Sequence, residues 1–176
     1  MGVFIIIDQL YYCVYNNGHS IEEFMRVDKN NYYLDIAQTV SERSTCLRRR
    51  YGAVIVKNDI IVSTGYNGAP RGRKNCCDCG FCRREAENVP HGERYELCRS
   101  VHAEQNAIIS ASKTEMLEAT LYLCCTDPVS GEVLPNTDCC MMCQRVILNS
   151  GIKTVVIRDT KNQFRAINVS DWMEKE

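Results

Sequence analysis

Two short segments constrain this chain more than any other feature: residues 102–104 (His-Ala-Glu) and residues 140–143 (Cys-Met-Met-Cys). Each is followed by an apolar pattern typical of an amphipathic helix, so each is predicted to begin a helix. Two thiols three residues apart at a helix start project from the same turn. The positive end of the helix dipole favours the thiolates that bind metal. The fold is therefore expected to bring two helix starts together around one metal ion.

The residue types predict a catalytic zinc site. His102, Cys140 and Cys143 give zinc three protein ligands and leave a fourth position for water, as catalytic zinc sites do. Glu104, two residues past His102, is placed to exchange a proton with that water and poorly placed to share the metal. Cys139 offers a competing register, but only Cys140 and Cys143 have the two-residue gap of a Cys-x-x-Cys pair.

Two readings of a different kind compete with an enzyme. A lone Cys-x-x-Cys is often part of a structural zinc module that serves as a binding partner, or a redox pair. Glu104 favours the enzyme, because a closed structural site has no need of a carboxylate facing the metal. The redox interpretation is weakened because no thioredoxin-like βαβ pattern surrounds the Cys-x-x-Cys pair.

Composition limits the compartment and the partners. The formal net charge of −1 argues against a polynucleotide partner, which would need a basic surface. The apolar run at residues 2–7 is too short for a membrane span or a signal peptide, so we expect no membrane partner. Twelve cysteines without a signal peptide favour a reducing cytoplasm and metal binding over disulfides.

The order of elements predicts the fold class. Residues 1–28 are expected to be an N-terminal appendage with a short strand at Val3–Ile7 and a turn at 16–18, and residues 29–176 a single zinc-dependent domain. The predicted elements are a helix at 31–45, a hairpin of strands 52–57 and 60–66, a long irregular segment 67–99, a helix at 100–112, a strand at 119–125, a helix at 140–150 capped by Gly151, a strand at 153–158, and a helical or irregular tail. This order indicates a three-layer α/β/α fold with a mixed, roughly five-stranded sheet.

From Ser44 onward the chain resembles the cytidine deaminase superfamily, and within it the deoxycytidylate (dCMP) deaminases. The resemblance covers about residues 30–158, and one departure is Cys139, which stands where the superfamily signature has proline. It is carried by Ser44-Thr45-Cys46, residues 52–56 (Gly-Ala-Val-Ile-Val), residues 65–70 (Gly-Tyr-Asn-Gly-Ala-Pro), residues 102–107 (His-Ala-Glu-Gln-Asn-Ala), Leu121-Tyr122, and Cys140-x-x-Cys143 leading to residues 149–152 (Asn-Ser-Gly-Ile).

The resemblance implies a zinc-dependent hydrolysis of dCMP to dUMP and ammonia, with a cytidine deaminase-like fold. It implies that Glu104 is the proton shuttle and that Asn67, Ala103 and Tyr122 contact the substrate. It also implies a homo-oligomer, and dCTP and dTTP as effectors. The same chemistry on another cytosine nucleoside, a nucleotide or another amino-heterocycle is the alternative. Independently of the family, Arg48 is a candidate for the substrate phosphate, because arginine binds phosphate in a fork.

A second, structural zinc is also expected. Residues 67–99 are a long polar segment with five cysteines, and such a segment needs a metal or ligand to hold it. The resemblance implies Cys46 and Cys76 as ligands, and it places Ser100 where a phage relative has a glutamate ligand. We expect a site of Cys46, Cys76 and Cys98, completed by Cys79, Cys82 or His91. The remaining thiols, at positions 13, 77, 124 and 125, are interpreted as buried or free cysteines.

Overall fold

The protein is described here from a computed structural model, which describes the backbone of residues 3–7, 10–14, 26–90 and 92–173, with side chains from residue 26 onward. The expected turn at 16–18 and His91 lie outside the described residues. Strand β1 (Val3–Ile7) is present as predicted and pairs antiparallel with β2 (Leu10–Val14). The boundary between an appendage and a domain at residue 28 stays a prediction.

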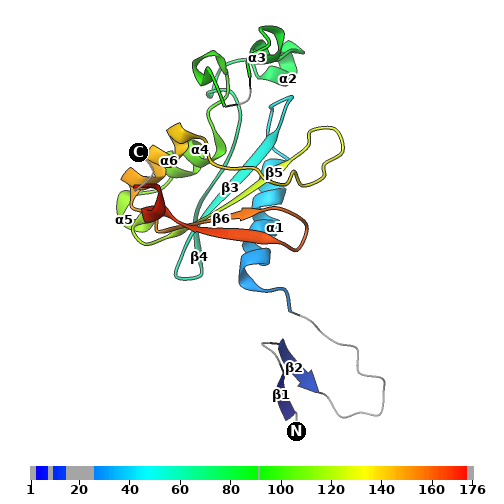
Figure 1. Cartoon of the computed structure of the whole chain (residues 1–176), viewed down its shortest axis with the longest axis vertical. Helices are drawn as coiled ribbons and strands as arrows, with labels where there is room; N and C mark the ends of the chain where they lie inside the picture. Colours follow the sequence, from blue (N-terminus) through cyan, green and yellow to red (C-terminus); the bar gives the residue numbers. More distant parts are fainter. Residues whose placement is uncertain (1–2, 8–9, 15–25, 91, 174–176) are drawn as a thin grey trace.

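The main sheet has five strands in the order β4-β3-β5-β6-β7 (Figure 1). One pair, β5 with β6, is parallel, and the other neighbours are antiparallel, so the sheet is mixed as predicted. The hairpin of β3 and β4 turns at Asn58 and Asp59, whose φ angles of 51° and 62° are those of a tight hairpin turn. The strands are β3 (Arg50–Lys57), β4 (Ile60–Tyr66), β5 (Thr120–Thr126), β6 (Thr154–Arg158) and β7 (Phe164–Asn168).

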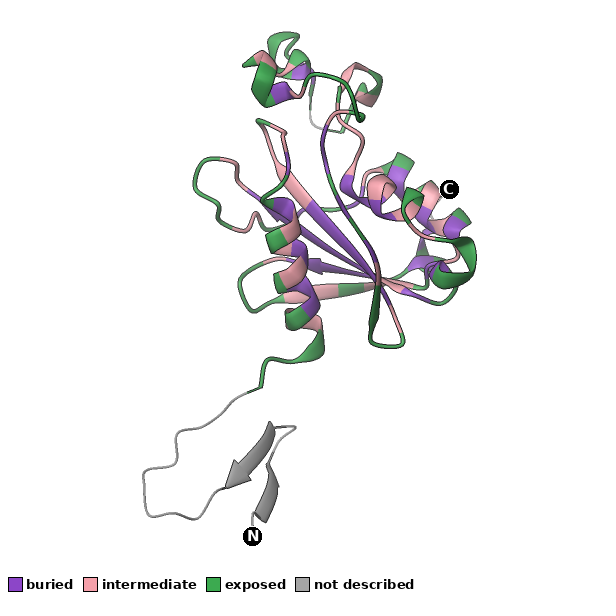
Figure 2. Cartoon of the chain, turned by 180° about the vertical axis from the view of Figure 1, so that it is seen from behind, coloured by how far each residue is buried: buried purple, intermediate pink, exposed green. Residues whose placement is uncertain are grey.

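Helices cover both faces of this sheet and make the expected three layers (Figure 2). Helix α1 (Lys29–Ser41) lies on one face; α4 (Ala103–Ile109), α5 (Lys113–Met116) and α6 (Met141–Ser150) lie on the other. Side chains alternate along each strand, so β5 gives Leu121 and Leu123 to the core beneath α4 and α6, and Cys124 to the core beneath α1. No helix in the described part of the chain has the length and apolar character needed to cross a membrane.

The predicted helices 31–45 and 100–112 are shorter in the structure, as α1 and α4, and two other segments differ more. The tail is not helical or irregular throughout, because it contains β7 and a 3₁₀ turn at Val169–Trp172, which buries Trp172 in the core. The long segment 67–99 contains α2 (Cys76–Cys79), α3 (Arg83–Ala86) and a 3₁₀ turn at Tyr95–Leu97. These short elements lie beyond one end of the sheet (Figure 1). Gly151 caps α6 in the left-handed conformation, as predicted.

Helix α4 lies directly on strand β4 because Gly65 has no side chain. A Cβ atom at Gly65 would lie 2.3 Å from both the carbonyl oxygen of Ala103 and the amide nitrogen of Ala107. Both distances are far inside van der Waals contact, so any larger residue would push the start of α4 away from the sheet.

Candidate active site

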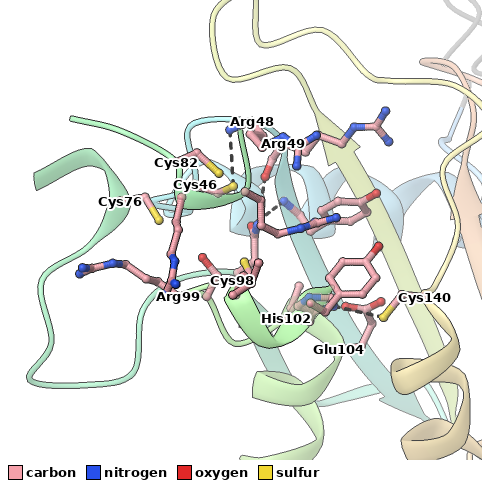
Figure 3. Close-up of a pocket in the computed structure, with 18 of the residues that line it drawn as sticks. Cys46, Arg48, Arg49, Cys76, Cys82, Cys98, Arg99, His102, Glu104 and Cys140 are labelled. Carbon is pink, nitrogen blue, oxygen red and sulfur yellow. Dashed lines mark hydrogen bonds between the residues drawn. The ribbon is translucent and has the colours of Figure 1, made fainter. Parts of the chain in front are cut away.

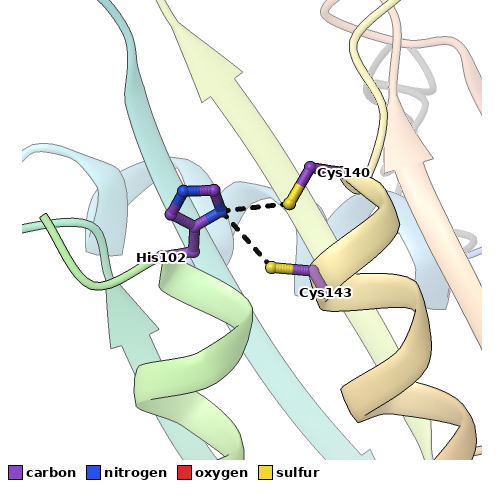
Figure 4. A group of neighbouring side chains, drawn as sticks. All are labelled: His102, Cys140 and Cys143. Carbon is purple, nitrogen blue, oxygen red and sulfur yellow. Dashed lines mark hydrogen bonds between the residues drawn. The ribbon is translucent and has the colours of Figure 1, made fainter. Parts of the chain in front are cut away.

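Two helix starts hold the three predicted metal ligands. His102 is the N-cap of α4, Cys140 is the N-cap of α6, and Cys143 lies in the first turn of α6. The Nδ1 atom of His102 lies 3.4 Å from the Sγ atom of Cys140 and 3.3 Å from that of Cys143 (Figure 4). The structure therefore brings these three side chains together, with all their ligand atoms within 4.8 Å of one another.

This donor set fits zinc. In a tetrahedral zinc site with ordinary Zn–N and Zn–S bonds, a nitrogen and a sulfur ligand lie about 3.6 Å apart. The separations of 3.3 and 3.4 Å are close to that value, so an ion could enter with small side-chain shifts. One imidazole and two thiols are also the ligand types that favour zinc over magnesium or calcium. His102, Cys140 and Cys143 are thus the residues that could hold a metal here.

Burial and hydrogen bonding set the ionisation of these groups. The pKa of Glu104, whose side chain is 3% exposed, is raised because burial disfavours its charged form. A hydrogen bond from the Cys143 thiol lowers the pKa of Cys140, and the same bond raises the pKa of Cys143. Burial alone would lower the pKa of His102, but its hydrogen bond with Cys140 and the charge of Glu104 raise it overall.

His102, Glu104 and Cys140 line one pocket, together with three of the four residues expected to contact the substrate (Figure 3). Ala103 is fully buried in its wall. Asn67 lies in the wall as well, where its Oδ1 accepts hydrogen bonds from the Ser44 hydroxyl (2.6 Å) and the Tyr51 amide (2.8 Å). Arg48 lines the pocket and pairs through Nε with Glu85, at 3.1 Å.

Tyr122 does not line this pocket, so the geometry gives no support to the prediction that it contacts the substrate, which stays a prediction. It packs against Tyr33 of α1, with ring centroids 5.0 Å apart, on the opposite face of the sheet. Its hydroxyl donates a hydrogen bond to Asn30 Oδ1 at 3.1 Å and lines a separate hollow. The physical reason is the alternation of β5, in which Leu121 faces α4 and α6 and the next residue must face α1.

Four of the cysteines proposed for a second metal line the same pocket, toward one side of it: Cys46, Cys76, Cys82 and Cys98 (Figure 3). Burial raises the pKa of Cys76, and the neighbouring thiols of the other three raise it further. Cys79 does not line the pocket; its sulfur accepts a hydrogen bond from Arg99 Nη1 at 3.5 Å. Within the described ranges, only His102, Cys140 and Cys143 form a set of three or more ligand atoms within 4.8 Å of one another.

Sequence reasoning missed an aromatic residue beside the metal ligands. The ring of Tyr95 packs edge-on against His102, with centroids 5.1 Å apart and an interplanar angle of 76°. The guanidinium of Arg84 lies over the Tyr95 ring, with its Cζ atom 4.5 Å from the ring centroid. The available signal was a tyrosine in an otherwise polar segment shortly before His102.

Comparisons with known proteins agree with this geometry. The family model described as "Cytidine and deoxycytidylate deaminase zinc-binding region" matches residues 27–159. The chain is 36% identical over 135 residues to the deoxycytidylate deaminase of Mycobacterium phage D29, covering 74% of this chain and 94% of that relative. It is 32% identical over 133 residues to the deoxycytidylate deaminase of Schizosaccharomyces pombe, covering 76% of this chain but only 38% of that relative's length.

A solved structure is also similar. The dCMP deaminase of the cyanophage S-TIM5 in apo form has a TM-score of 0.52 and 28% identity, covering 76% of this chain and 85% of that one. The same phage enzyme in complex with dCMP and dUMP has a TM-score of 0.50 and 27% identity, covering 76% and 83%.

Proposed function

This chain belongs to the cytidine and deoxycytidylate deaminase family, and from that premise we propose that it hydrolyses dCMP to dUMP and ammonia. The observation that carries the proposal is a buried carboxylate, Glu104, in one pocket with His102 and Cys140, which form a zinc-type donor set with Cys143. The relatives named deoxycytidylate deaminase, and the phage enzyme solved with dCMP and dUMP, support this choice of substrate.

The chain's own residues divide the work as follows. A zinc ion bound by His102, Cys140 and Cys143 supplies a Lewis acid that makes water nucleophilic near neutral pH. Glu104 accepts a proton from the attacking water and delivers it to N3 of the cytosine ring. The oxygen of that water bonds to C4, and Glu104 takes the remaining proton from the new C4 hydroxyl and passes it to the amine. The C4 carbonyl then forms as the C4–N bond breaks and ammonia leaves. The raised pKa of Glu104 suits this role, because a carboxyl that both takes and gives a proton works best with a pKa near the working pH.

The charge of the pocket supports a nucleotide as the substrate. Five arginines contribute to its lining, and arginine binds a phosphate through two parallel hydrogen bonds. Arg48 already has Glu85 as a partner, so phosphate binding there would need the pair to open or be shared. The arginines are Arg48, Arg49, Arg83, Arg84 and Arg99.

We also propose a second, structural zinc bound by Cys46, Cys76, Cys82 and Cys98. All four line one pocket, whereas Cys79 does not. Four thiols are a complete ligand set for structural zinc. The sequence left three candidates for the fourth ligand, Cys79, Cys82 and His91, and we choose Cys82 among them.

Three further parts of the proposal concern the setting of the enzyme. A homo-oligomer is supported by Ile60 and Ile61, which are exposed on the edge strand β4. Regulation by dCTP and dTTP is supported by the family resemblance alone. A cytoplasmic location is supported by the many cysteines, because cysteines bind metal only in the reduced form and the cytoplasm is a reducing compartment.

The decisive experiment is ammonia release from dCMP, CMP, deoxycytidine and dCTP in parallel, with and without dCTP as an effector, on protein whose zinc has been counted. We expect selective turnover of dCMP, with about two zinc ions per chain. Turnover of only another cytosine compound would move the substrate assignment within the same chemistry. If none of them is turned over with zinc present, the chain is either a non-enzymatic zinc module or an enzyme that acts on another amino-heterocycle.

A further inference from the structure

Arg84 contacts the segment that carries Tyr95, the aromatic residue that packs against His102. Its side chain, in α3, is buried, with the residue 6% exposed. Its Nη2 donates hydrogen bonds to the carbonyl oxygens of Pro90 (2.9 Å) and Glu93 (2.6 Å). A buried charge must be compensated by hydrogen bonds, and these two carbonyl oxygens supply them to the guanidinium. The same guanidinium packs on Tyr95, which fixes the ring in place.

Tyr95 in turn faces the place where a substrate must react. Its ring lies against His102, and both residues line the pocket with Glu104. The reacting carbon of an aminopyrimidine has to lie within reach of Glu104 and of a metal held by His102. A flat six-membered ring placed there lies alongside Tyr95, and aromatic side chains bind nucleobases by stacking.

We propose that Tyr95 is the aromatic surface against which the pyrimidine ring of the substrate packs, and that Arg84 is a positioning residue that holds Tyr95 there. The inference rests on the proposed function, since it requires a pyrimidine in this pocket. It assigns base recognition to Tyr95, separately from the pocket arginines other than Arg84, which are the candidates for binding the phosphate. Arg84 acts through the ring and does not itself contact the base.

The test separates base recognition from general support of the fold. In a Glu104→Gln background, in which turnover is expected to be slowed about 10²- to 10⁴-fold, calorimetry measures the affinity for dCMP and for 2-deoxyribose 5-phosphate, which lacks the base. Tyr95→Leu is expected to weaken dCMP about tenfold through loss of stacking, and the sugar phosphate less than about twofold. Tyr95→Phe, which restores the ring, is expected to rescue the affinity for dCMP. Tyr32→Leu, at an exposed tyrosine on α1, is the matched control.

The role of Arg84 is tested by Arg84→Met alone and combined with Tyr95→Leu. If Arg84 acts through the ring, the double variant loses no more dCMP affinity than Tyr95→Leu alone. In the active enzyme, both single variants are expected to raise KM about tenfold with little change in kcat. The Tyr95 variants decide the question of base packing even if Arg84→Met does not fold.

Three results would overturn the inference: unchanged dCMP affinity in Tyr95→Leu, an equal loss for both ligands, or loss of zinc from that variant. Equal loss or zinc loss would mean that the ring supports the fold or His102. These outcomes differ from a failure of the proposed function, in which the parent chain with zinc bound releases ammonia from no cytosine compound.

Discussion

Two groups of potential metal ligands have members in the lining of one pocket, and they are organised in different ways. The catalytic group, His102, Cys140 and Cys143, lies at the starts of two helices packed on the sheet, with its ligand atoms within 4.8 Å of one another. The loop cysteines, Cys46, Cys76, Cys82 and Cys98, come from segments outside the sheet and line the same pocket without gathering as closely.

The difference indicates where the energy of each arrangement comes from. Residues of α4 and α6, such as Ala107 and Ile147, are fully buried against the sheet, so hydrophobic packing holds the two helices that carry the catalytic group. The short helices α2 and α3 have four residues each and cannot be stable on their own. The order of their loop is therefore expected to depend on metal binding, which couples directly to folding in such segments.

The largest expected effect is the loss of turnover when Glu104, beside the catalytic group, is substituted. Glu104→Gln removes the proton shuttle, so kcat should fall by about 10² to 10⁴. Zinc content should stay at the parental level, because packing places the ligands and Glu104 is not one of them. Ammonia release and metal analysis on the same sample measure both quantities. Zinc loss in this variant would show that the carboxylate holds the site together.

Removing zinc with a chelator should separate the two groups. Amides of residues 76–90 and 92–98 are expected to exchange hydrogen about tenfold faster or more in the metal-free protein, because their loop loses its cross-link. Amides of α6 should change much less, since packing on the sheet remains. Hydrogen exchange followed by mass spectrometry makes the comparison. Equal acceleration in both regions would contradict it.

Two single substitutions should test which loop cysteines bind the second zinc ion. Cys82→Ser is expected to cost one zinc ion and to lower Tm by about 5–10 °C, as loss of a few kcal/mol does in a chain of this size. Cys79→Ser is the matched control, on the same loop but outside the pocket lining, and should keep both metals. Metal analysis and calorimetry decide; loss of zinc from Cys79→Ser instead would reverse the ligand assignment.

The smallest effect concerns Cys124, a thiol that belongs to neither group. Burial in β5 raises its pKa from 9.0 to about 12. The folded state therefore keeps the thiol proton after the unfolded state has lost it. The protonated Cys124 thiol therefore makes its full contribution to the free energy of unfolding below pH 9, and this contribution is lost as pH rises toward 12. From pH 8 to pH 10 the loss is about 1 kcal/mol. Urea unfolding of the parent and of Cys124→Ala should give a steeper alkaline decline in the parent, and equal declines would contradict this.

Local spacing along the chain predicted the fold class and the side chains that meet at the site. A Cys-x-x-Cys pair at a helix start and a His-x-Glu at another need only helical geometry to place their ligands. Strand β7 escaped prediction because it is an edge strand with no fully buried residue, so its apolar pattern is weak. Tyr122 was assigned from a motif, while the alternation of β5 would have sent it to the other face. The choice among Cys79, Cys82 and His91 depends on a loop whose path no local pattern encodes.

The contact of Gly65 with α4 has a consequence for reading mutational data. The helix that begins after His102 packs on a strand position where no Cβ atom fits. The distance between this helix and the sheet, and with it the position of His102, therefore depends on glycine at position 65. A saturation screen for activity should therefore score position 65 as severely as Glu104, although Gly65 does no chemistry. A signature segment such as Gly-Tyr-Asn-Gly can thus contain a residue that is required for the packing distance between a helix and the sheet, as well as residues that contact a substrate.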